Sequence, residues 1–69
     1  MHYTPKEIGK LIRDTRKSQG ITQKQLSLVA GTGIRFIIEL ERGKETSHFG
    51  KVLLVLRTLG IKMNFITPK

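Results

Sequence analysis

The 69-residue sequence contains no cysteine, few acidic residues and no long apolar run. Without cysteine the chain can form neither a disulfide nor a Cys₂His₂ zinc site, so neither stabilises this small domain. We therefore expect association with a second copy to supply stability. No apolar run reaches the length of about 18 residues that a transmembrane helix needs, and the first residues, MHYT, lack the apolar core of a secretory signal. These absences predict a single-domain cytoplasmic protein with no membrane partner.

Basic residues, in contrast to acidic ones, are abundant. Thirteen Lys and Arg face five Asp and Glu, which gives a net charge of +8 and an isoelectric point near 10.5. Such a surface suits a polyanionic partner, above all nucleic acid. A soluble or ribosome-associated basic protein has the same composition, so charge alone does not decide between these classes.

The first periodic stretch predicts a helix over residues 4–19. Thr4 is a suitable N-cap, Pro5 fits the first helical position, and Glu7 completes a capping box with Thr4. The apolar face of this helix repeats at helical spacing and consists of Ile8, Leu11, Ile12 and Thr15.

Residues 20–44 predict two short helices joined by a tight turn. Thr22 and Gln25 form another capping box, and Leu26 and Val29 lie three apart on one face. Two glycines in the segment AGTG then allow a sharp turn. A second helix follows over Ile34–Arg42, its inner face formed by Ile37 and Leu40 and its end by Gly43. Two helices across a short glycine-containing turn predict a helix-turn-helix, whose second helix enters a DNA groove.

Residues 49–59, FGKVLLVLRTL, predict the last helix, which Thr46 or Ser47 can cap. Its main apolar stripe consists of Phe49, Val52, Leu53, Leu56 and Leu59. Leu54 and Val55 fall outside this stripe, so the helix is apolar nearly all round. Because that is too much apolar surface for a lone small domain, we predict that Val55 lies against a second copy.

The C-terminal residues 61–66 alternate apolar and polar side chains except at the last position, a pattern typical of a strand. A single strand needs a partner edge, so we predict that Ile61, Met63 and Phe65 lie at a strand pairing with its copy in a second subunit. A frayed tail is the alternative. The predicted organisation is a DNA-binding domain over residues 1–60 and a dimerising strand and tail over residues 61–69.

The segment TQKQLSLVAGTG, followed by LERGK, resembles the helix-turn-helix of the Cro/C1-type (XRE) repressor family. The matching positions are Thr22, Gln23, Leu26, Ala30, Gly31, Ile37, Leu40 and Glu41–Lys44, preceded by Arg13 and Arg16. A minimal unit of this kind ending in LGIKMNF is similar to HipB-like antitoxins of toxin–antitoxin pairs. The resemblance implies an all-α, lambda-repressor-like domain of four to five helices, with a short C-terminal β-strand pairing across a dimer.

The resemblance also implies roles for single residues. Arg16 pairs with Glu41 and fixes the recognition helix against the first helix. Gln23 braces the DNA contact at a helix N-terminus, where free N–H groups suit a phosphate; simple solvation is its alternative. Ile34 and Arg35 occupy the first exposed positions of the recognition helix, which read base edges in the major groove.

Arg35 is the strongest candidate for base recognition, because a guanidinium can bond guanine O6 and N7 together. Its alternative is a surface ion pair with Glu39, which in turn either accepts from cytosine or only holds Arg35. The residues expected at the DNA surface are Gln23, Lys24, Thr32, Gly33, Ile34, Arg35, Glu39, Arg42 and Lys44.

The predicted recognition helix carries more apolar residues than its core contacts need. Ile34, Phe36 and Ile38 add to Ile37 and Leu40, where many family members carry Ser, Thr or Gln. Extra core, contact with thymine methyl groups and contact with a protein partner are the three interpretations.

No arrangement typical of an active site is present. His2 and His48 lack a neighbouring acidic or cysteine cluster, and the segment GTG lacks the remaining residues of a phosphate-binding loop. We therefore expect no enzyme activity, no cofactor and no metal.

The predicted function is transcriptional repression by a homodimer on an inverted-repeat operator of double-stranded DNA, with the protein on the nucleoid when bound. The resemblance adds autoregulation of a toxin–antitoxin operon and a toxin of the HipA kinase type as partner. The alternatives are a stand-alone or phage-type regulator, and a protein-interaction subunit whose DNA binding is secondary.

Overall fold

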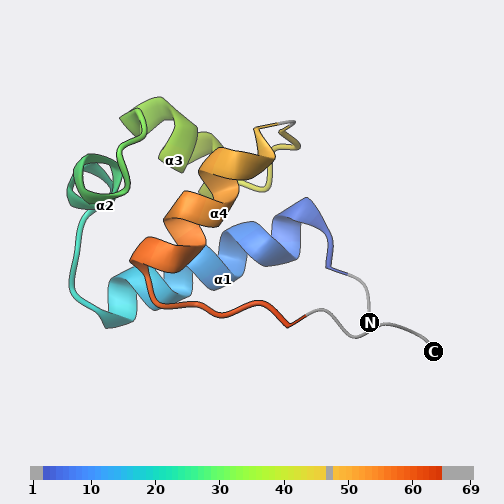
Figure 1. The fold of residues 1–69 in the computed structure, drawn as a ribbon, viewed down its shortest axis with the longest axis horizontal. Helices are drawn as coiled ribbons and strands as arrows, with labels where there is room; N and C mark the ends of the chain where they lie inside the picture. Colours follow the sequence, from blue (N-terminus) through green and yellow to red (C-terminus); the bar gives the residue numbers. More distant parts are fainter. Residues whose placement is uncertain (1–2, 47, 65–69) are drawn as a thin grey trace.

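The computed structural model describes residues 3–46 and 48–64. Within them the chain forms the helices α1 (Pro5–Ser18), α2 (Gln23–Ala30), α3 (Ile34–Glu41) and α4 (Phe49–Thr58). α3 packs on both α1 and α2, while α2 also packs on α4, which crosses in front of α1 (Figure 1). The expectation of an all-α domain is confirmed for these residues, and the number of helices is four.

Both predicted capping boxes are present. The Thr4 hydroxyl accepts from the Glu7 backbone N–H (3.1 Å), and the Glu7 carboxylate accepts from the Thr4 N–H (2.9 Å). Thr22 and Gln25 repeat this exchange at the start of α2, at 3.0 and 2.8 Å. Local side-chain chemistry therefore fixes where α1 and α2 begin.

The centre of the core is built from one side chain of each helix. Ile12, Leu26, Ile37 and Val55, from α1 to α4 in turn, are fully buried. Around them lie Ala30, Leu40, Val52, Leu56 and Leu59. Each helix contributes to this shared core, so the domain is one packing unit.

The prediction that Val29 shares the inner face of α2 with Leu26 is wrong. Val29 is 74% exposed and its neighbour Leu28 is 71% exposed. The inner face instead runs through Leu26, Ser27 and Ala30. This face therefore includes two small side chains, Ser27 and Ala30, while Val29 faces solvent.

The assignment of Val55 to a contact with a second copy is also wrong, because its side chain is fully buried within one chain. The buried stripe of α4 is formed by Val52, Val55, Leu56 and Leu59, while Phe49, Leu53 and Leu54 remain exposed. The predicted stripe and the observed buried stripe both have helical spacing. In a helix that is apolar nearly all round, the sequence pattern therefore does not show which side faces the core.

The start of α4 differs from the expectation as well. His48 occupies the N-cap position, without a side-chain capping bond. The Thr46 hydroxyl accepts from the His48 N–H (3.0 Å) and so stabilises the turn before the helix rather than the helix start. Ser47, the other predicted cap, lies outside the described residues.

The predicted C-terminal strand is not formed in its described part, residues 61–64. These residues run back along α1 (Figure 1), and Ile61 packs against the core. A strand needs a neighbouring edge, which the described part of this single chain does not offer. Pairing with a second copy remains a prediction, and Phe65 lies outside the described residues.

Candidate nucleic-acid interface

A three-residue turn joins α2 to α3. Gly31 ends α2 in the left-handed conformation (φ 76°), and the N–H groups of Gly31 and Thr32 both donate to the Ser27 carbonyl at 3.0 Å. Gly33 is the N-cap of α3 with an extended backbone (φ −77°), and no side chain caps that end. Of the two glycines only Gly31 has the positive φ that makes glycine necessary in the turn. Gly33 has an ordinary backbone conformation, and because it has no side chain, it cannot cap the first N–H groups of α3.

A buried ion pair fixes α3 against α1. Arg16 Nε lies 2.6 Å from Glu41 Oε2, and Arg16 Nη2 donates to Glu41 Oε1 at 3.0 Å. Arg16 Nη1 also donates to the Ile21 carbonyl, and Gln23 Nε2 donates to Glu41 Oε1. The hydrogen bond to Glu41 raises the pKa of Arg16 above its usual value. The structure thus brings Arg16, Glu41 and the predicted DNA contact Gln23 into one network that joins α1, α2 and α3.

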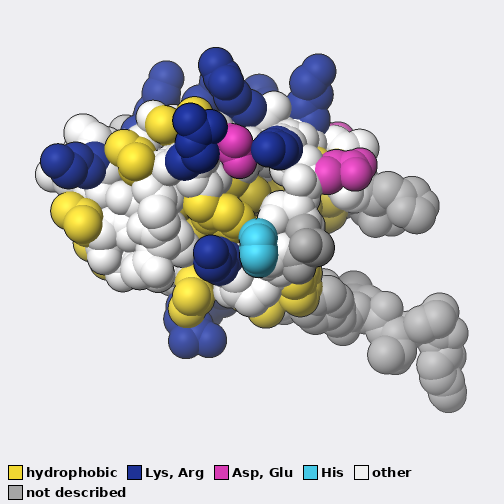
Figure 2. All heavy atoms as spheres, turned by 90° about the horizontal axis from the view of Figure 1, so that it is seen from above, with side chains coloured by type: hydrophobic (Ala, Val, Ile, Leu, Met, Phe, Trp, Pro, Cys, Tyr) yellow, Lys and Arg dark blue, Asp and Glu magenta, His cyan; other side chains and the backbone are white. Residues whose placement is uncertain are grey.

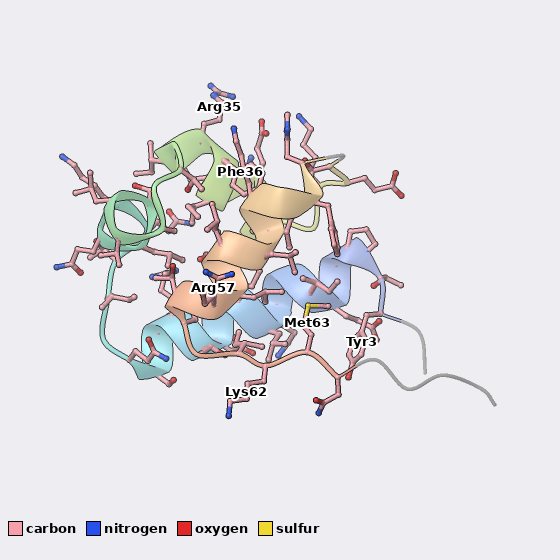
Figure 3. The ribbon with its side chains drawn as sticks, in the orientation of Figure 1. Tyr3, Arg35, Phe36, Arg57, Lys62 and Met63 are labelled. Atoms are coloured by element: carbon pink, nitrogen blue, oxygen red, sulfur yellow. The ribbon has the colours of Figure 1, made fainter. Side chains whose placement is uncertain are left out.

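The outer face of α3 is charged. Arg35, Glu39 and Arg42 follow one another at i, i+4 and i+7 and therefore share this face. The Arg35 side chain is 87% exposed and points away from the body of the protein (Figure 3). Arg35 Nη1 lies 3.6 Å from Glu39 Oε2, so the anticipated surface ion pair is present while the guanidinium stays accessible.

The remaining predicted DNA residues border this face. Lys24 is exposed near the start of α2, Thr32 and Gly33 form the turn, Ile34 is half-exposed, and Lys44 follows α3. Seen from above, Lys and Arg side chains surround this side of the molecule, with acidic side chains among them (Figure 2). The helix-turn-helix thus gathers cations around an exposed α3.

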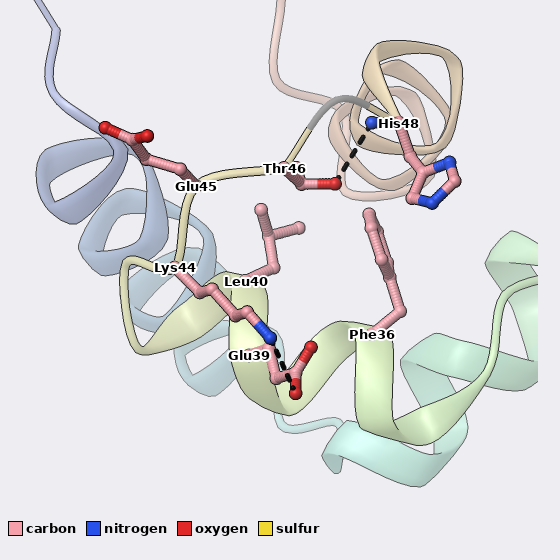
Figure 4. A pocket seen from close by; sticks show the side chains of 7 residues that line it. All are labelled: Phe36, Glu39, Leu40, Lys44, Glu45, Thr46 and His48. Carbon is pink, nitrogen blue, oxygen red and sulfur yellow. Dashed lines mark hydrogen bonds and ion pairs between the residues drawn. The ribbon is translucent and has the colours of Figure 1, made fainter.

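The additional apolar residues of α3 are mainly used inside the protein. Phe36 and Ile38 are partly buried, and Phe36 packs against the core. The Phe36 ring meets His48 edge-on at 6.5 Å, and Lys51 Nζ lies 5.7 Å from its centroid. A hollow of about 290 Å³ opens beside it (Figure 4), lined by Phe36, Glu39, Leu40, Lys44, Glu45, Thr46 and His48. Ile34 alone of the three is exposed, at 44%.

Two structural contacts were not predicted from the sequence. Gln19 Nε2 donates to the Leu59 carbonyl (2.8 Å) and so joins the end of α1 to the end of α4. Gly9 is buried where α1 meets α3, against the backbone of Leu40 and Glu41. A helix-interior glycine is the only sequence signal that could have indicated the second contact.

Within residues 3–46 and 48–64, no group of three His, Cys, Asp or Glu side chains could hold a metal ion. Over the same residues, no helix is both long and apolar enough to cross a membrane.

A capped α2, a tight turn and an exposed cationic α3, held on α1 by a buried ion pair, define a helix-turn-helix domain of the DNA-binding type. Comparison with known proteins agrees with this class. The helix-turn-helix family matches residues 12–66, and the chain therefore belongs to the helix-turn-helix family of DNA-binding transcriptional regulators, of the XRE type.

The chain is similar to regulators from two bacteria. It is 51% identical to the uncharacterized HTH-type transcriptional regulator y4mF of Sinorhizobium fredii, over 94% of this chain and 86% of that protein. It is 36% identical to an uncharacterized HTH-type transcriptional regulator of Haemophilus influenzae, over 84% of this chain and 57% of that protein.

Two solved structures share the fold. The restriction-modification controller protein C.AhdI from Aeromonas hydrophila superposes with a TM-score of 0.75, at 22% identity and 84% coverage of both chains. A protein called MDT superposes with a TM-score of 0.84, at 20% identity, over 100% of this chain and 97% of the other. At these identities the likeness shows the fold alone.

Proposed function

We propose that this regulator is a sequence-specific repressor that binds a short inverted repeat near its own promoter. The observation that carries the proposal is the accessible guanidinium of Arg35 on the outer face of α3. The buried Arg16–Glu41 pair fixes the orientation of α3 itself. Gln23, Lys24, Arg42 and Lys44 then act mainly on phosphates, which position the protein, while Arg35 reads a guanine and Ile34 meets a thymine methyl group.

The first test is binding to the DNA upstream of the gene, against scrambled DNA of equal length, over a salt series. A repressor is expected to prefer the upstream DNA by about a thousandfold or more, whereas binding through phosphates alone weakens equally on both DNAs as salt rises. Arg35→Ala is expected to cost about 1–3 kcal/mol on the upstream DNA and little on scrambled DNA.

Arg57→Ala is the matched control for this experiment. Arg57 is an exposed arginine on α4, away from the outer face of α3 (Figure 3), so the substitution removes the same charge elsewhere. Equal losses on both DNAs for Arg35→Ala would reduce Arg35 to a phosphate contact. No preference of the wild-type protein at any salt would refute promoter binding at this DNA.

The proposed binding unit is a homodimer with two-fold symmetry, because an inverted repeat presents two equivalent half-sites about 34 Å apart. We propose that the second copy binds on the side formed by α1, α4 and residues 61–64, where an apolar groove of about 440 Å³ lies. It is lined by Tyr3, Ile8, Leu11, Leu56, Ile61, Lys62, Met63 and Asn64. Met63 and Leu11 are about half-exposed there, and pairing of the two tails as strands would extend the same contact.

Leu11→Glu is expected to weaken this dimer at least about tenfold, because it places a charge on a contact that buries a leucine. Sedimentation equilibrium over a concentration series measures the change. Leu28→Glu is the control, since Leu28 is an exposed leucine on α2 outside the groove. If Leu11→Glu and Leu28→Glu change the dimer dissociation constant equally, the dimer contact does not involve this groove.

A finer candidate function is that of a HipB-like antitoxin, which also binds a toxin of the HipA kinase type. Its support is the similarity of the tail and the exposed apolar pair Leu28 and Val29, which the fold leaves uncovered in a single chain. Co-purification with the product of the neighbouring gene tests it. Upstream DNA binding without such a complex would favour a stand-alone or phage-type regulator.

A further inference from the structure

Glu39 is the acidic side chain that α3 exposes at its outer face. The chain has five acidic residues, and the other one in α3, Glu41, is buried in its pair with Arg16. Glu39 is partly exposed, lies between two cations and contacts both through the same oxygen: Oε2 is 3.6 Å from Arg35 Nη1 and 3.3 Å from Lys44 Nζ. Two of the cations expected to contact DNA thus share one carboxylate.

The turn after α3 brings the backbone of Lys44 next to Glu39. Gly43, just past the end of α3, has a positive φ (88°). Its N–H donates to the Leu40 carbonyl and the Lys44 N–H donates to the Glu39 carbonyl, both at 3.0 Å. This is a Schellman motif, which commonly places an apolar contact between the same two positions. Here an ion pair takes that place (Figure 4): the backbone bonds bring the start of the Lys44 side chain next to Glu39, and its ammonium reaches the carboxylate.

Arg35 is held less firmly. The pair spans one helical turn with the cation on the N-terminal side, the less favourable order for an i, i+4 pair. Since Arg35 is far more exposed than Glu39, water competes for the guanidinium. Arg35 can therefore leave Glu39 more readily than Lys44 can.

A carboxylate at this position matters because DNA is a polyanion. When Arg35 and Lys44 turn toward phosphates, Glu39 is left close to negative charge and loses its partners. When Arg35 instead reaches a guanine, the Glu39 carboxylate faces the groove, where a neighbouring cytosine amine can donate to it. Glu39 therefore makes binding to phosphates alone less favourable, and it weakens binding to a matching base sequence less.

We infer that Glu39 is a specificity-determining residue that holds back Arg35 and Lys44 from DNA of the wrong sequence. The inference rests on the proposed DNA binding and adds a residue that repels non-matching DNA rather than attracting it. Glu39 lowers affinity for random DNA, and its removal widens the range of sequences that the protein binds.

The test compares Glu39→Gln with Glu45→Gln on the upstream DNA and on scrambled DNA, over a salt series. Both substitutions remove one negative charge near the end of α3. Glu45, however, points away from Glu39 and Lys44 (Figure 4), so it reports the effect of net charge alone. Thermal unfolding without DNA is measured in parallel; an exposed pair of this kind contributes little to stability, so both variants should unfold close to the wild type.

Glu39→Gln is expected to tighten binding to scrambled DNA about tenfold, because the freed cations gain phosphate contacts there. On the upstream DNA the gain should be less than about threefold, because Arg35 already contacts a guanine and the substitution removes the Glu39 contact with a cytosine amine. The salt slope on scrambled DNA should steepen by about 1, the signature of one added phosphate contact. Glu45→Gln should change both DNAs by the same small factor.

Two results would overturn the inference. If Glu39→Gln and Glu45→Gln behave alike, Glu39 contributes only net charge. If the wild-type protein itself fails to distinguish the two DNAs, the proposed repressor function is refuted, and the inference with it.

Discussion

Glu41→Ala is expected to destabilise the protein by about 3–5 kcal/mol, because it leaves the Arg16 guanidinium buried without its partner. The two side chains are 9% and 2% exposed, so water cannot replace the lost contact. Arg16 would keep its bond to the Ile21 carbonyl, while Gln23 would lose its acceptor. For a domain of this size such a loss is a large part of the total stability.

Urea unfolding followed by circular dichroism measures this effect. The double variant Arg16→Met with Glu41→Leu is the control, because it removes both charges and keeps apolar volume, and it should cost far less than Glu41→Ala. If the double variant loses as much stability as the single one, the loss comes from packing rather than from an uncompensated charge.

The destabilisation should not depend on pH near neutrality. Glu41 raises the folded-state pKa of Arg16, so the pair's contribution is fully present below the unfolded pKa of arginine and is lost only as pH rises through the folded value. Arginine remains charged throughout the range from about pH 6 to 9. A cost that varied across this range would assign the effect to another titrating group.

Gly9→Ala is expected to destabilise the fold by about 2–3 kcal/mol, as overpacking does where neighbours cannot move. A methyl group at this position would collide with the Leu40 carbonyl oxygen and lie 3.0 Å from that of Glu41. Both atoms belong to the backbone of α3, which cannot turn aside as a side chain can. The gain in helix propensity from Gly to Ala, about 1 kcal/mol, offsets only part of this cost.

Gly50→Ala is the matched control, because a methyl group there meets no atom within 4 Å. Gly50 lies in α4, so the same substitution should leave stability unchanged or raise it slightly. Because α3 carries Arg35, Gly9→Ala should also weaken DNA binding at temperatures where the protein is still folded. Equal unfolding midpoints for the two variants would show that α1 and α3 can separate without loss.

The helices could be predicted from the sequence, and for α1 and α2 so could the chemistry of their starting points, because it is short-range. Thr4 with Glu7 and Thr22 with Gln25 satisfy backbone groups three residues away, whatever the rest of the chain does. The Arg16–Glu41 pair followed from resemblance to a family, since 25 residues separate its members and no local rule joins them.

The rotation of each helix could be predicted only in part. In α1 Ile12 is buried as predicted, but Leu11 of the same predicted face is 44% exposed, and the buried positions are Gly9, Ile12 and Arg16. In α4 and α2 several apolar stripes compete, and the sequence pattern predicts the wrong side for both valines: Val55 is buried and Val29 is exposed. The choice depends on which stripe matches the shape of the neighbouring helices, a property of all four helices together.

The sequence by itself determined the class of this protein: a small, basic, all-helical domain with a capped helix-turn-helix and an arginine at the start of its second helix. Those features depend on spacing, capping and charge, which are local. Only the tertiary structure decided how the charges are shared, because the Schellman turn after α3 brings Lys44 back over Glu39 while Arg35 reaches it from the preceding turn. It also decided that Gly9 must stay small, since only packing brings the α3 backbone against that position.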